Sequence, residues 1–248
     1  KDRVGSEIRT HYPATIEEAM AITSQEAWTR RNGNRLREVP AYLREVIELI
    51  SFLAREDKRV DRRSGVSQRL SISCLESVVS NAEQRAARNH ETEIVARMTD
   101  VYAAIPSMTG KIELEYEGEL RGADSIAREL IRAAVGKVFD RHLEGALLQP
   151  VVQWFEMGGE LRLEQTTPAD EMLPQLKRIQ GLMDNVDRLG VCNHGDTASV
   201  AAAAEFILEG LYAHKRISRN EERGFYAEKP KPAEPRDPAG RSPRRQFN

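Results

Sequence analysis

The sequence contains little cysteine, few aromatic residues and almost no net charge. Its two cysteines, Cys74 and Cys192, are too few for a disulfide framework or a cysteine-based metal knuckle, which favours a reducing compartment. Aromatic residues make up 6% of the chain and hydrophobic ones 40%, a profile more typical of helix-rich soluble proteins than of β-sandwiches. A net charge of −2 gives no overall basic field that would attract nucleic acid or acidic membranes.

Long apolar runs are also missing. No segment approaches the roughly 20 consecutive apolar residues that a membrane-spanning helix needs, and the first residues do not form a signal peptide. We therefore expect a cytoplasmic protein without a membrane partner. The chain starts at Lys1 rather than at a methionine, and we interpret it as a fragment whose N-terminal part is missing.

A complete triphosphate site cannot be assembled from this sequence. Gly110-Lys111 and Gly136-Lys137 resemble the end of a phosphate-binding loop, but neither pair is followed by Ser or Thr or preceded by the glycine that the loop requires. No apolar strand ends in the paired acids that hold magnesium. We conclude that this chain does not hold a triphosphate unaided.

A metal centre is not expected either. Cys192, His194 and Asp196 lie close together in a predicted loop. A structural zinc site needs about four ligands, and no second cluster supplies the rest. We interpret these residues as a connecting loop and assign no metal ligand.

Hydrophobic periodicity predicts a mainly α-helical fold. Helices are expected over residues 15–30, 40–57, 71–89, 94–105, 124–142, 151–157, 169–189 and 197–218. Apolar and acidic residues alternate over 111–117 (KIELEYE), which predicts a short β arm, and 160–165 is a second strand candidate. Residues 228–248 hold five of the eleven prolines, so the tail from 224 to 248 is predicted to be disordered.

The segment 64–70 (SGVSQRL) contains the most specific candidate site. Gly65 permits a sharp backbone turn, and Ser67 is a suitable N-cap for the helix that follows. Arg69 then falls in the first turn of that helix, where the helix dipole disfavours a cation. A guanidinium beside free backbone N–H groups is suited to bind an anion such as phosphate. The alternative is an ordinary surface arginine beside a capped helix.

Two motifs together resemble the C-terminal part of a magnesium chelatase-like, MoxR-related AAA+ ATPase. They are KDRVGSEIRTHYP at residues 1–13 and SGVSQRL at 64–70. In that family an arginine finger in a PL-K-D-R segment closes the nucleotide-binding core, and a G-x-S-x-R motif, called sensor 2, opens a helix of the lid domain. The matching residues are Arg3 for the finger and Gly65, Ser67 and Arg69 for sensor 2.

The resemblance covers roughly the first 145 residues and implies a division of the chain. Residues 1–14 would end the nucleotide-binding core, 15–145 would form the helical lid domain with its β arm, and 146–223 a further helical region, before the tail. Gly145 and Pro150 mark the boundary between the second and third parts.

The same resemblance implies roles and partners. Arg3 would reach the γ-phosphate of ATP bound by a neighbouring subunit, and Arg69 would contact the phosphates of ATP on its own subunit, with Gly65 and Ser67 shaping the motif backbone. The full protein would use Mg-ATP, with magnesium ligands outside this chain, to remodel a protein client as a ring of identical subunits. The fragment alone would be inactive.

Two other functions remain open. A non-catalytic helical adaptor would bind partners through apolar grooves and the tail. Nucleic-acid binding through the basic run 58–63 and the tail is a weaker alternative, because Glu56, Asp57 and Asp61 are interleaved with the cations of the run. We expect that run to be a solvated connector.

Overall fold

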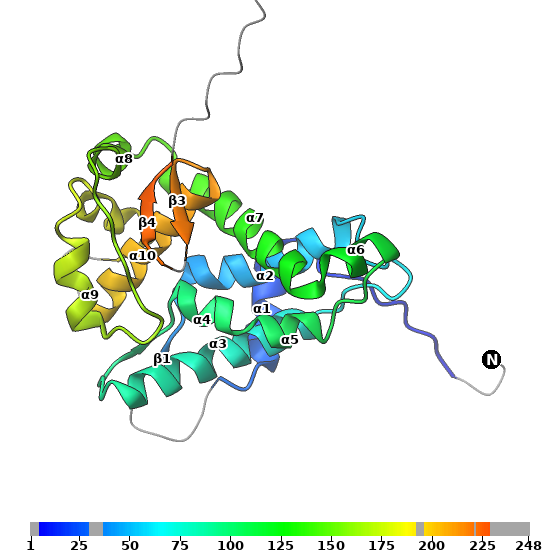
Figure 1. Ribbon diagram of the computed structural model, residues 1–248. Helices are drawn as coiled ribbons and strands as arrows, with labels where there is room; N and C mark the ends of the chain where they lie inside the picture. Colours follow the sequence, from blue (N-terminus) through cyan, green and yellow to red (C-terminus); the bar gives the residue numbers. More distant parts are fainter. Residues whose placement is uncertain (1–4, 30–36, 192–195, 221, 229–248) are drawn as a thin grey trace, which may run out of the picture.

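The computed structural model describes residues 5–29, 37–191, 196–220 and 222–228. These residues form ten α-helices, one 3-10 helix and two small two-stranded sheets (Figure 1). The prediction of a mainly helical fold is therefore confirmed. No helix in these segments has both the length and the apolar character that crossing a membrane requires.

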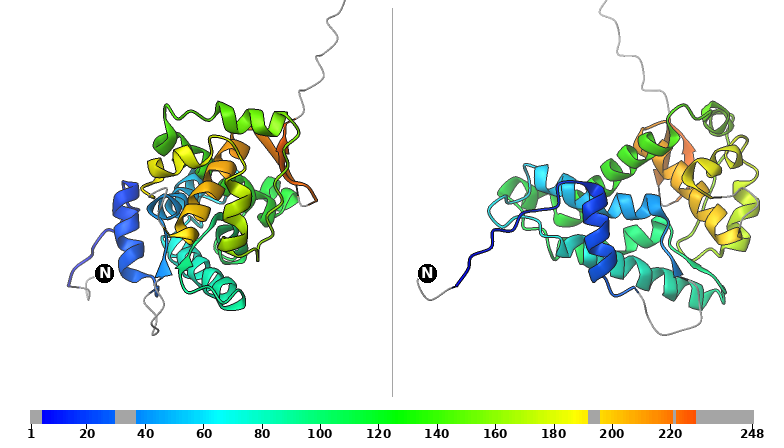
Figure 2. Two further views of the ribbon diagram at one scale, coloured as in Figure 1. Left: turned by 90° about the vertical axis from the view of Figure 1, so that its left-hand side faces the viewer. Right: turned by 180° about the vertical axis from the view of Figure 1, so that it is seen from behind.

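The first seven helices pack around α2 and α7. Their bounds are α1 Ile16–Glu26, α2 Ala41–Glu56, α3 Arg69–Arg88, α4 Met98–Ala103, α5 Ile105–Thr109, α6 Tyr116–Arg121 and α7 Ala123–Leu143. Helix α3 packs against α2, α4 and α5, while α1 lies on the outer side of α2 and α3 (Figure 2). Two short strands, β1 Arg37–Glu38 and β2 Ile94–Val95, pair in parallel.

The helices with the strongest local signals begin where they were predicted, although α1 ends at Glu26 rather than at residue 30. Thr15 caps α1, since its hydroxyl accepts a hydrogen bond from the backbone N–H of Glu18 at 3.2 Å. Pro40 immediately precedes α2, where its fixed φ angle and missing N–H do no harm. The face of α2 that carries Leu43, Ile47 and Ile50 is fully buried, as its three- and four-residue spacing indicated.

The remaining elements follow α7. They are α8 Gln149–Glu156, α9 Ala169–Leu176, the 3-10 helix η1 Met183–Leu189, α10 Thr197–Ala213, and the antiparallel strands β3 Ile217–Asn220 and β4 Gly224–Ala227. Helix α10 is buried along almost its whole length and packs against α7, α9 and η1.

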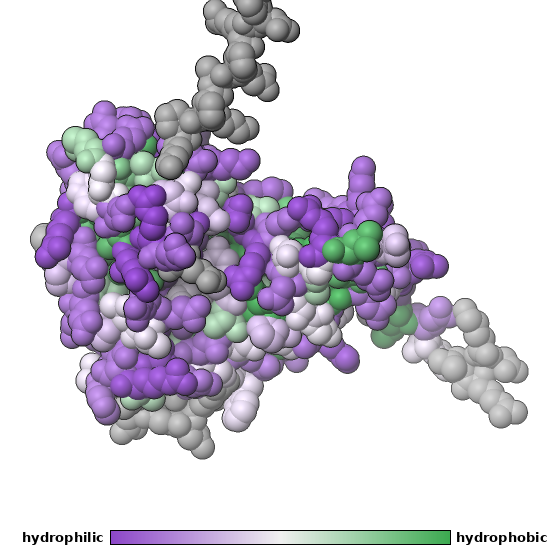
Figure 3. Space-filling model, in the orientation of Figure 1, coloured by the Kyte–Doolittle hydropathy of each residue, from purple (hydrophilic) through white to green (hydrophobic). Residues whose placement is uncertain are grey.

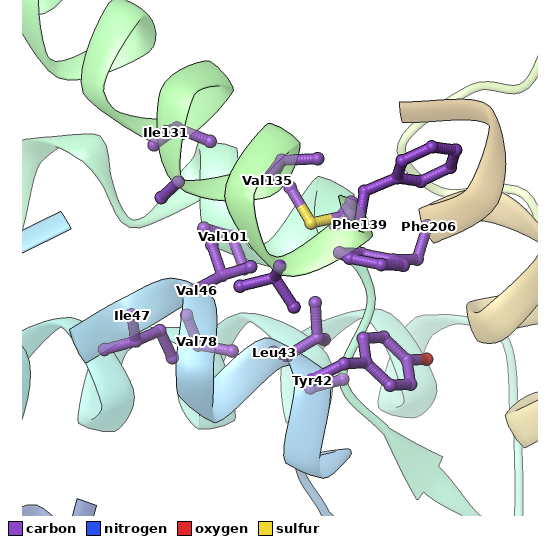
Figure 4. Packing of buried hydrophobic residues seen from close by; sticks show 14 of the residues in the cluster. Tyr42, Leu43, Val46, Ile47, Val78, Val101, Ile131, Val135, Phe139 and Phe206 are labelled. Atoms are coloured by element: carbon purple, nitrogen blue, oxygen red, sulfur yellow. The ribbon is translucent and has the colours of Figure 1, made fainter. Parts of the chain in front are cut away.

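One hydrophobic core joins the two halves of the chain. Phe206 of α10 packs on Tyr42 of α2 with 4.7 Å between ring centroids, next to Phe139 of α7 (Figure 4). Gly210 lets α10 approach α7 so closely that a Cβ atom there would lie 1.8 Å from the Phe139 ring. The helices on either side of residue 145 are therefore packed together.

The predicted β arm over 111–117 is wrong. Leu114 forms a single antiparallel bridge with Val60, and α6 begins at Tyr116. The alternating pattern is misleading because Tyr116 is 73% exposed, so its side chain does not share a buried face with Ile112. Two backbone hydrogen bonds instead hold this segment against the neighbouring loop, from Asp61 N–H to Glu113 O and from Glu115 N–H to Arg59 O.

Several predicted boundaries also differ from the structure. Residues 94–105 contain β2, α4 and the first residue of α5 rather than one helix, and Pro106 lies in the first turn of α5. The helix expected over 169–189 is divided into α9 and η1, and the one expected to reach 218 ends at Ala213. Residues 160–165 contribute only one bridge, from Leu161 to Phe225.

The tail prediction is wrong at its start and untested beyond. Residues 224–227, placed in the disordered tail, form strand β4. Positions 229–248 lie outside the described residues.

The face of the molecule in Figure 3 is mostly hydrophilic, with an apolar patch over α6, where Tyr116 and Leu120 are exposed.

Candidate functional site

The turn at residues 64–67 depends on Gly65. Its φ of +70° is in the left-handed region, and its N–H donates to Asp61 O at 3.1 Å. A Cβ at this position would lie 2.5 Å from the Tyr12 hydroxyl. The expectation of a glycine-dependent turn is confirmed, and a second reason for glycine is the close approach of the segment before α1.

Ser67 does not cap the following helix. Helix α3 starts at Arg69, its N-cap residue is Gln68, and no side chain accepts a hydrogen bond from its first turn. The Gln68 amide is used elsewhere, because it donates to Glu48 Oε2 at 2.7 Å and to Thr23 Oγ1 at 3.0 Å. The helix N-terminus is therefore left without a side-chain cap.

Arg69 is the first residue of α3 and is exposed to solvent. Within the described residues its side chain makes no hydrogen bond or ion pair, and the first turn of α3 contains no acidic residue. A cation at this end of a helix dipole is unfavourable and lacks local compensation. The segment thus presents an exposed guanidinium, without a partner in the described residues, at a helix start that lacks a side-chain cap. Such a guanidinium is suited to bind an anion.

The backbone around Arg69 is held by a second arginine. Arg55 of α2 donates from Nε to Val66 O at 2.9 Å and from Nη2 to Gln68 Oε1 at 3.3 Å. Its guanidinium stacks on the Tyr12 ring at 4.3 Å, and its partial burial lowers its pKa. Arg55, Tyr12 and Val66, together with Gly65, line a cavity of about 360 Å³. Arg55 therefore holds the residues that immediately precede Arg69 in place.

Other predicted site residues are not brought to this place by the described structure. Arg3 lies outside the described residues, as do Cys192 and His194. Asp196 caps α10 by accepting from Ser199 N–H at 2.7 Å. In the described segments no group of three or more His, Cys, Asp or Glu side chains could hold a metal ion.

Two of the four cations in the basic run 58–63 pair with acidic side chains. Arg59 pairs with Asp57 and Glu129 at 2.6 and 2.5 Å, and Arg63 contacts Asp61 at 3.5 Å. The hydrogen bond from Arg59 lowers the pKa of Asp57, as expected for a tight pair. This supports the interpretation of the run as a connector.

Sequence reasoning missed a second cationic site. Four arginines from distant segments, Arg128, Arg132, Arg162 and Arg219, line one cleft of about 440 Å³. We call this the arginine cleft. Only the i, i+4 spacing of Arg128 and Arg132 on α7 was visible in the sequence, and nothing local connects these two residues with the other two.

Comparison with known proteins gives no relative. No protein-family model, curated protein or solved structure matches the chain. The functional argument therefore depends on the residues themselves and on the motif resemblance.

Proposed function

We propose that this chain is the C-terminal part of a magnesium chelatase-like AAA+ ATPase, comprising the arginine-finger segment, the helical lid and the helices that follow. The whole protein would couple ATP hydrolysis to remodelling of a protein client as a ring of subunits in the cytoplasm. The fragment alone supplies arginines to nucleotide sites but no phosphate-binding loop.

The observation that carries the proposal is the state of Arg69. It occupies the position of the sensor 2 arginine in the G-x-S-x-R motif, it is exposed at the start of α3, and its side chain has no partner within the described residues. The glycine-dependent turn and the contacts of Arg55 hold the backbone just before Arg69 in place. A cation kept unpaired where the helix dipole opposes it is explained if phosphate oxygens complete the site.

The proposed mechanism needs little chemistry from the protein beyond placement of charge. In phosphoryl transfer, negative charge is spread over the phosphate oxygens, and cations that neutralise it lower the barrier. Arg69 would bind the phosphates of its own subunit, and its position at the start of α3 would transmit their loss to the lid. Arg3 would act on the neighbour's γ-phosphate, a contribution worth on the order of a thousandfold or more in rate.

ATPase turnover in a protein that joins the nucleotide-binding domain to this chain tests the proposal. Arg3→Ala and Arg69→Ala should each reduce turnover by about tenfold or more, because each removes a charge-assisted contact to phosphate. Arg178→Ala is the matched control, since Arg178 is also an exposed arginine. Turnover at the wild-type level in both variants would rule out the assignment.

An adaptor function is the second candidate, and the exposed Tyr116 and Leu120 on α6 favour it. This function predicts a stable monomer whose behaviour does not change when nucleotide is added, even when the chain is joined to the nucleotide-binding domain. Nucleotide-dependent assembly measured by light scattering would exclude it.

A further inference from the structure

The arginine cleft lies between elements from both halves of the chain. Arg128 and Arg132 come from α7, Arg162 from the segment after α8, and Arg219 from β3. Tyr102 of α4 and Tyr212 of α10 complete the wall. Its volume of about 440 Å³ is within the range of small-molecule sites.

Two of the four arginines have weak partners. Arg128 is 4.0 Å from Asp124, and Arg162 is 3.9 Å from Glu164, with more than half of each of these four side chains exposed. Such pairs contribute little in water, because solvent screens them. Both guanidinium groups therefore remain available to a stronger anion.

Arg219 is neutralised and serves to anchor the hairpin. It pairs with Glu209, a buried carboxylate of α10 that also accepts a hydrogen bond from the Tyr102 hydroxyl at 3.1 Å. Its guanidinium lies 5.1 Å from the centre of the Phe225 ring. These contacts fix strand β3 against α10 and set the shape of the cleft on that side.

Arg132 is the cation that the fold leaves uncompensated. Its Nη2 donates to the Tyr212 hydroxyl at 2.8 Å, and its guanidinium lies 4.6 Å from the centre of that ring. No carboxylate in the described residues pairs with it, and its Nε is buried without a hydrogen-bond partner. An arginine remains charged under all ordinary conditions and has five N–H donors, so most of its capacity is unused here.

The aromatic rings of the cleft indicate what part of a ligand is recognised. The Arg132 guanidinium lies over the Tyr212 ring and the Arg219 guanidinium lies over the Phe225 ring. Both rings are therefore already engaged in cation–π contacts. The site is therefore organised to present N–H donors rather than flat apolar surfaces. Planar guanidinium groups match the oxygens of a phosphate group, to which they donate in pairs.

We propose that the arginine cleft is a binding site for a small phosphorylated anion, recognised through its phosphate group by Arg132 with Arg128 and Arg162. The site is separate from the segment around Arg69 and does not depend on the ATPase assignment. Because its walls come from α7 and from the β3–β4 hairpin, a bound anion links these two parts of the molecule.

Calorimetric titration of the 248-residue chain with pyrophosphate and with inorganic phosphate, at constant ionic strength, tests the proposal. Saturable binding is expected, with a rise in the unfolding temperature as the ligand saturates the folded state. Arg132→Gln should weaken pyrophosphate binding by about tenfold or more, and Arg128→Gln by a smaller factor. Arg178→Gln, a matched charge change away from the cleft, should bind as the wild type does.

Three results would overturn the proposal. They are the absence of saturable binding by the wild-type chain, equal affinity in Arg132→Gln, and equal binding of citrate, a carboxylate anion of comparable charge. If Arg132→Gln does not fold, Arg128→Gln decides, because the Arg128 side chain is exposed and its screened pair with Asp124 contributes little to stability. An unchanged affinity in Arg128→Gln would then contradict the proposal.

Discussion

Helix α3 has one arginine at its first residue and another in its last turn, and the two are in opposite situations. Arg69 is exposed and has no partner in the described part of the chain. Arg85 is buried and donates to Asp100 Oδ2 at 3.0 Å, Glu91 Oε2 at 3.0 Å and Val95 O at 2.7 Å. Burial would lower the pKa of Arg85, but the two carboxylates outweigh it and raise the pKa above its ordinary value.

The buried end of α3 belongs to a wider ion network, which we define as Arg85, Glu91, Arg97, Asp100 and Glu205. Arg97 is 2% exposed and donates to Gln165 O and Thr167 O, so it holds the segment that precedes α9. A charge enclosed by partners stabilises the fold only while all partners remain. Arg69 has no such constraint, and this difference marks it as available to a ligand.

Removing a partner at the buried end should have the largest effect on stability. Asp100 accepts from the Arg97 backbone N–H at 2.9 Å as well as from Arg85. Asp100→Ala leaves buried cations uncompensated and should lower the free energy of unfolding by about 3–5 kcal/mol. Urea denaturation checks this, with Asp187→Ala, an exposed acid, as the control. Equal stability of the two variants would show that the network is not structural.

Glu91→Gln should have an intermediate effect. Glu91 Oε1 accepts from Ala169 N–H at the start of α9, at 2.9 Å, while Oε2 accepts from Arg85. The amide keeps one acceptor oxygen but loses the charge, so we expect a loss of about 1–2 kcal/mol. Glu144→Gln, at an exposed position after α7, should change the unfolding midpoint little, and a Glu91→Gln midpoint that matches it would contradict the prediction.

The pH dependence of the free energy of unfolding should show the titration of Glu205, a buried member of the ion network. Burial raises the pKa of Glu205, although Arg97 and Arg219 oppose that shift. Near and above its ordinary pKa of 4.5 the folded state then binds more protons than the unfolded state, so this group makes stability fall as pH rises through that window. Glu205→Gln should remove this slope from unfolding curves measured between pH 4 and 7. A slope identical to that of the wild type would exclude a raised pKa.

The smallest stability effect is expected at Arg69, and its sign is opposite. Arg69→Glu places an acid at the positive end of the α3 dipole and should stabilise the folded chain by about 0.3–1 kcal/mol. Arg178 lies outside the helices, so Arg178→Glu should not raise the stability of the folded chain. A destabilised Arg69→Glu variant would mean that Arg69 already has a structural partner.

What the sequence could predict depended on how local each signal was. Thr15, Pro40 and the stripe of α2 act within a few residues of themselves, and those helices lie where expected. Ser67 was misassigned because Gln68, held by Glu48 from another helix, takes the N-cap position. A long-range contact decided this local detail.

The hairpin and the arginine cleft could not be predicted from the sequence, because both depend on contacts between distant segments. Strand β4 is held by Leu161, which pairs with Phe225 from far along the chain. Arg132 and Arg219 line the same cleft although they are far apart in the sequence, and Gly210 allows α10 to lie close to α7. Periodicity identifies the faces of helices, but it does not say which charged side chains gather between them.

The most direct test of the central claim is the affinity of the Arg69→Ala variant for ATP, measured by titration in the protein that joins the nucleotide-binding domain to this chain. If Arg69 is left unpaired so that it can bind phosphate, the dissociation constant should rise by about tenfold or more while the unfolding midpoint stays unchanged. Arg178→Ala should retain the wild-type affinity. An ATP affinity in Arg69→Ala equal to that of the wild type would contradict the account.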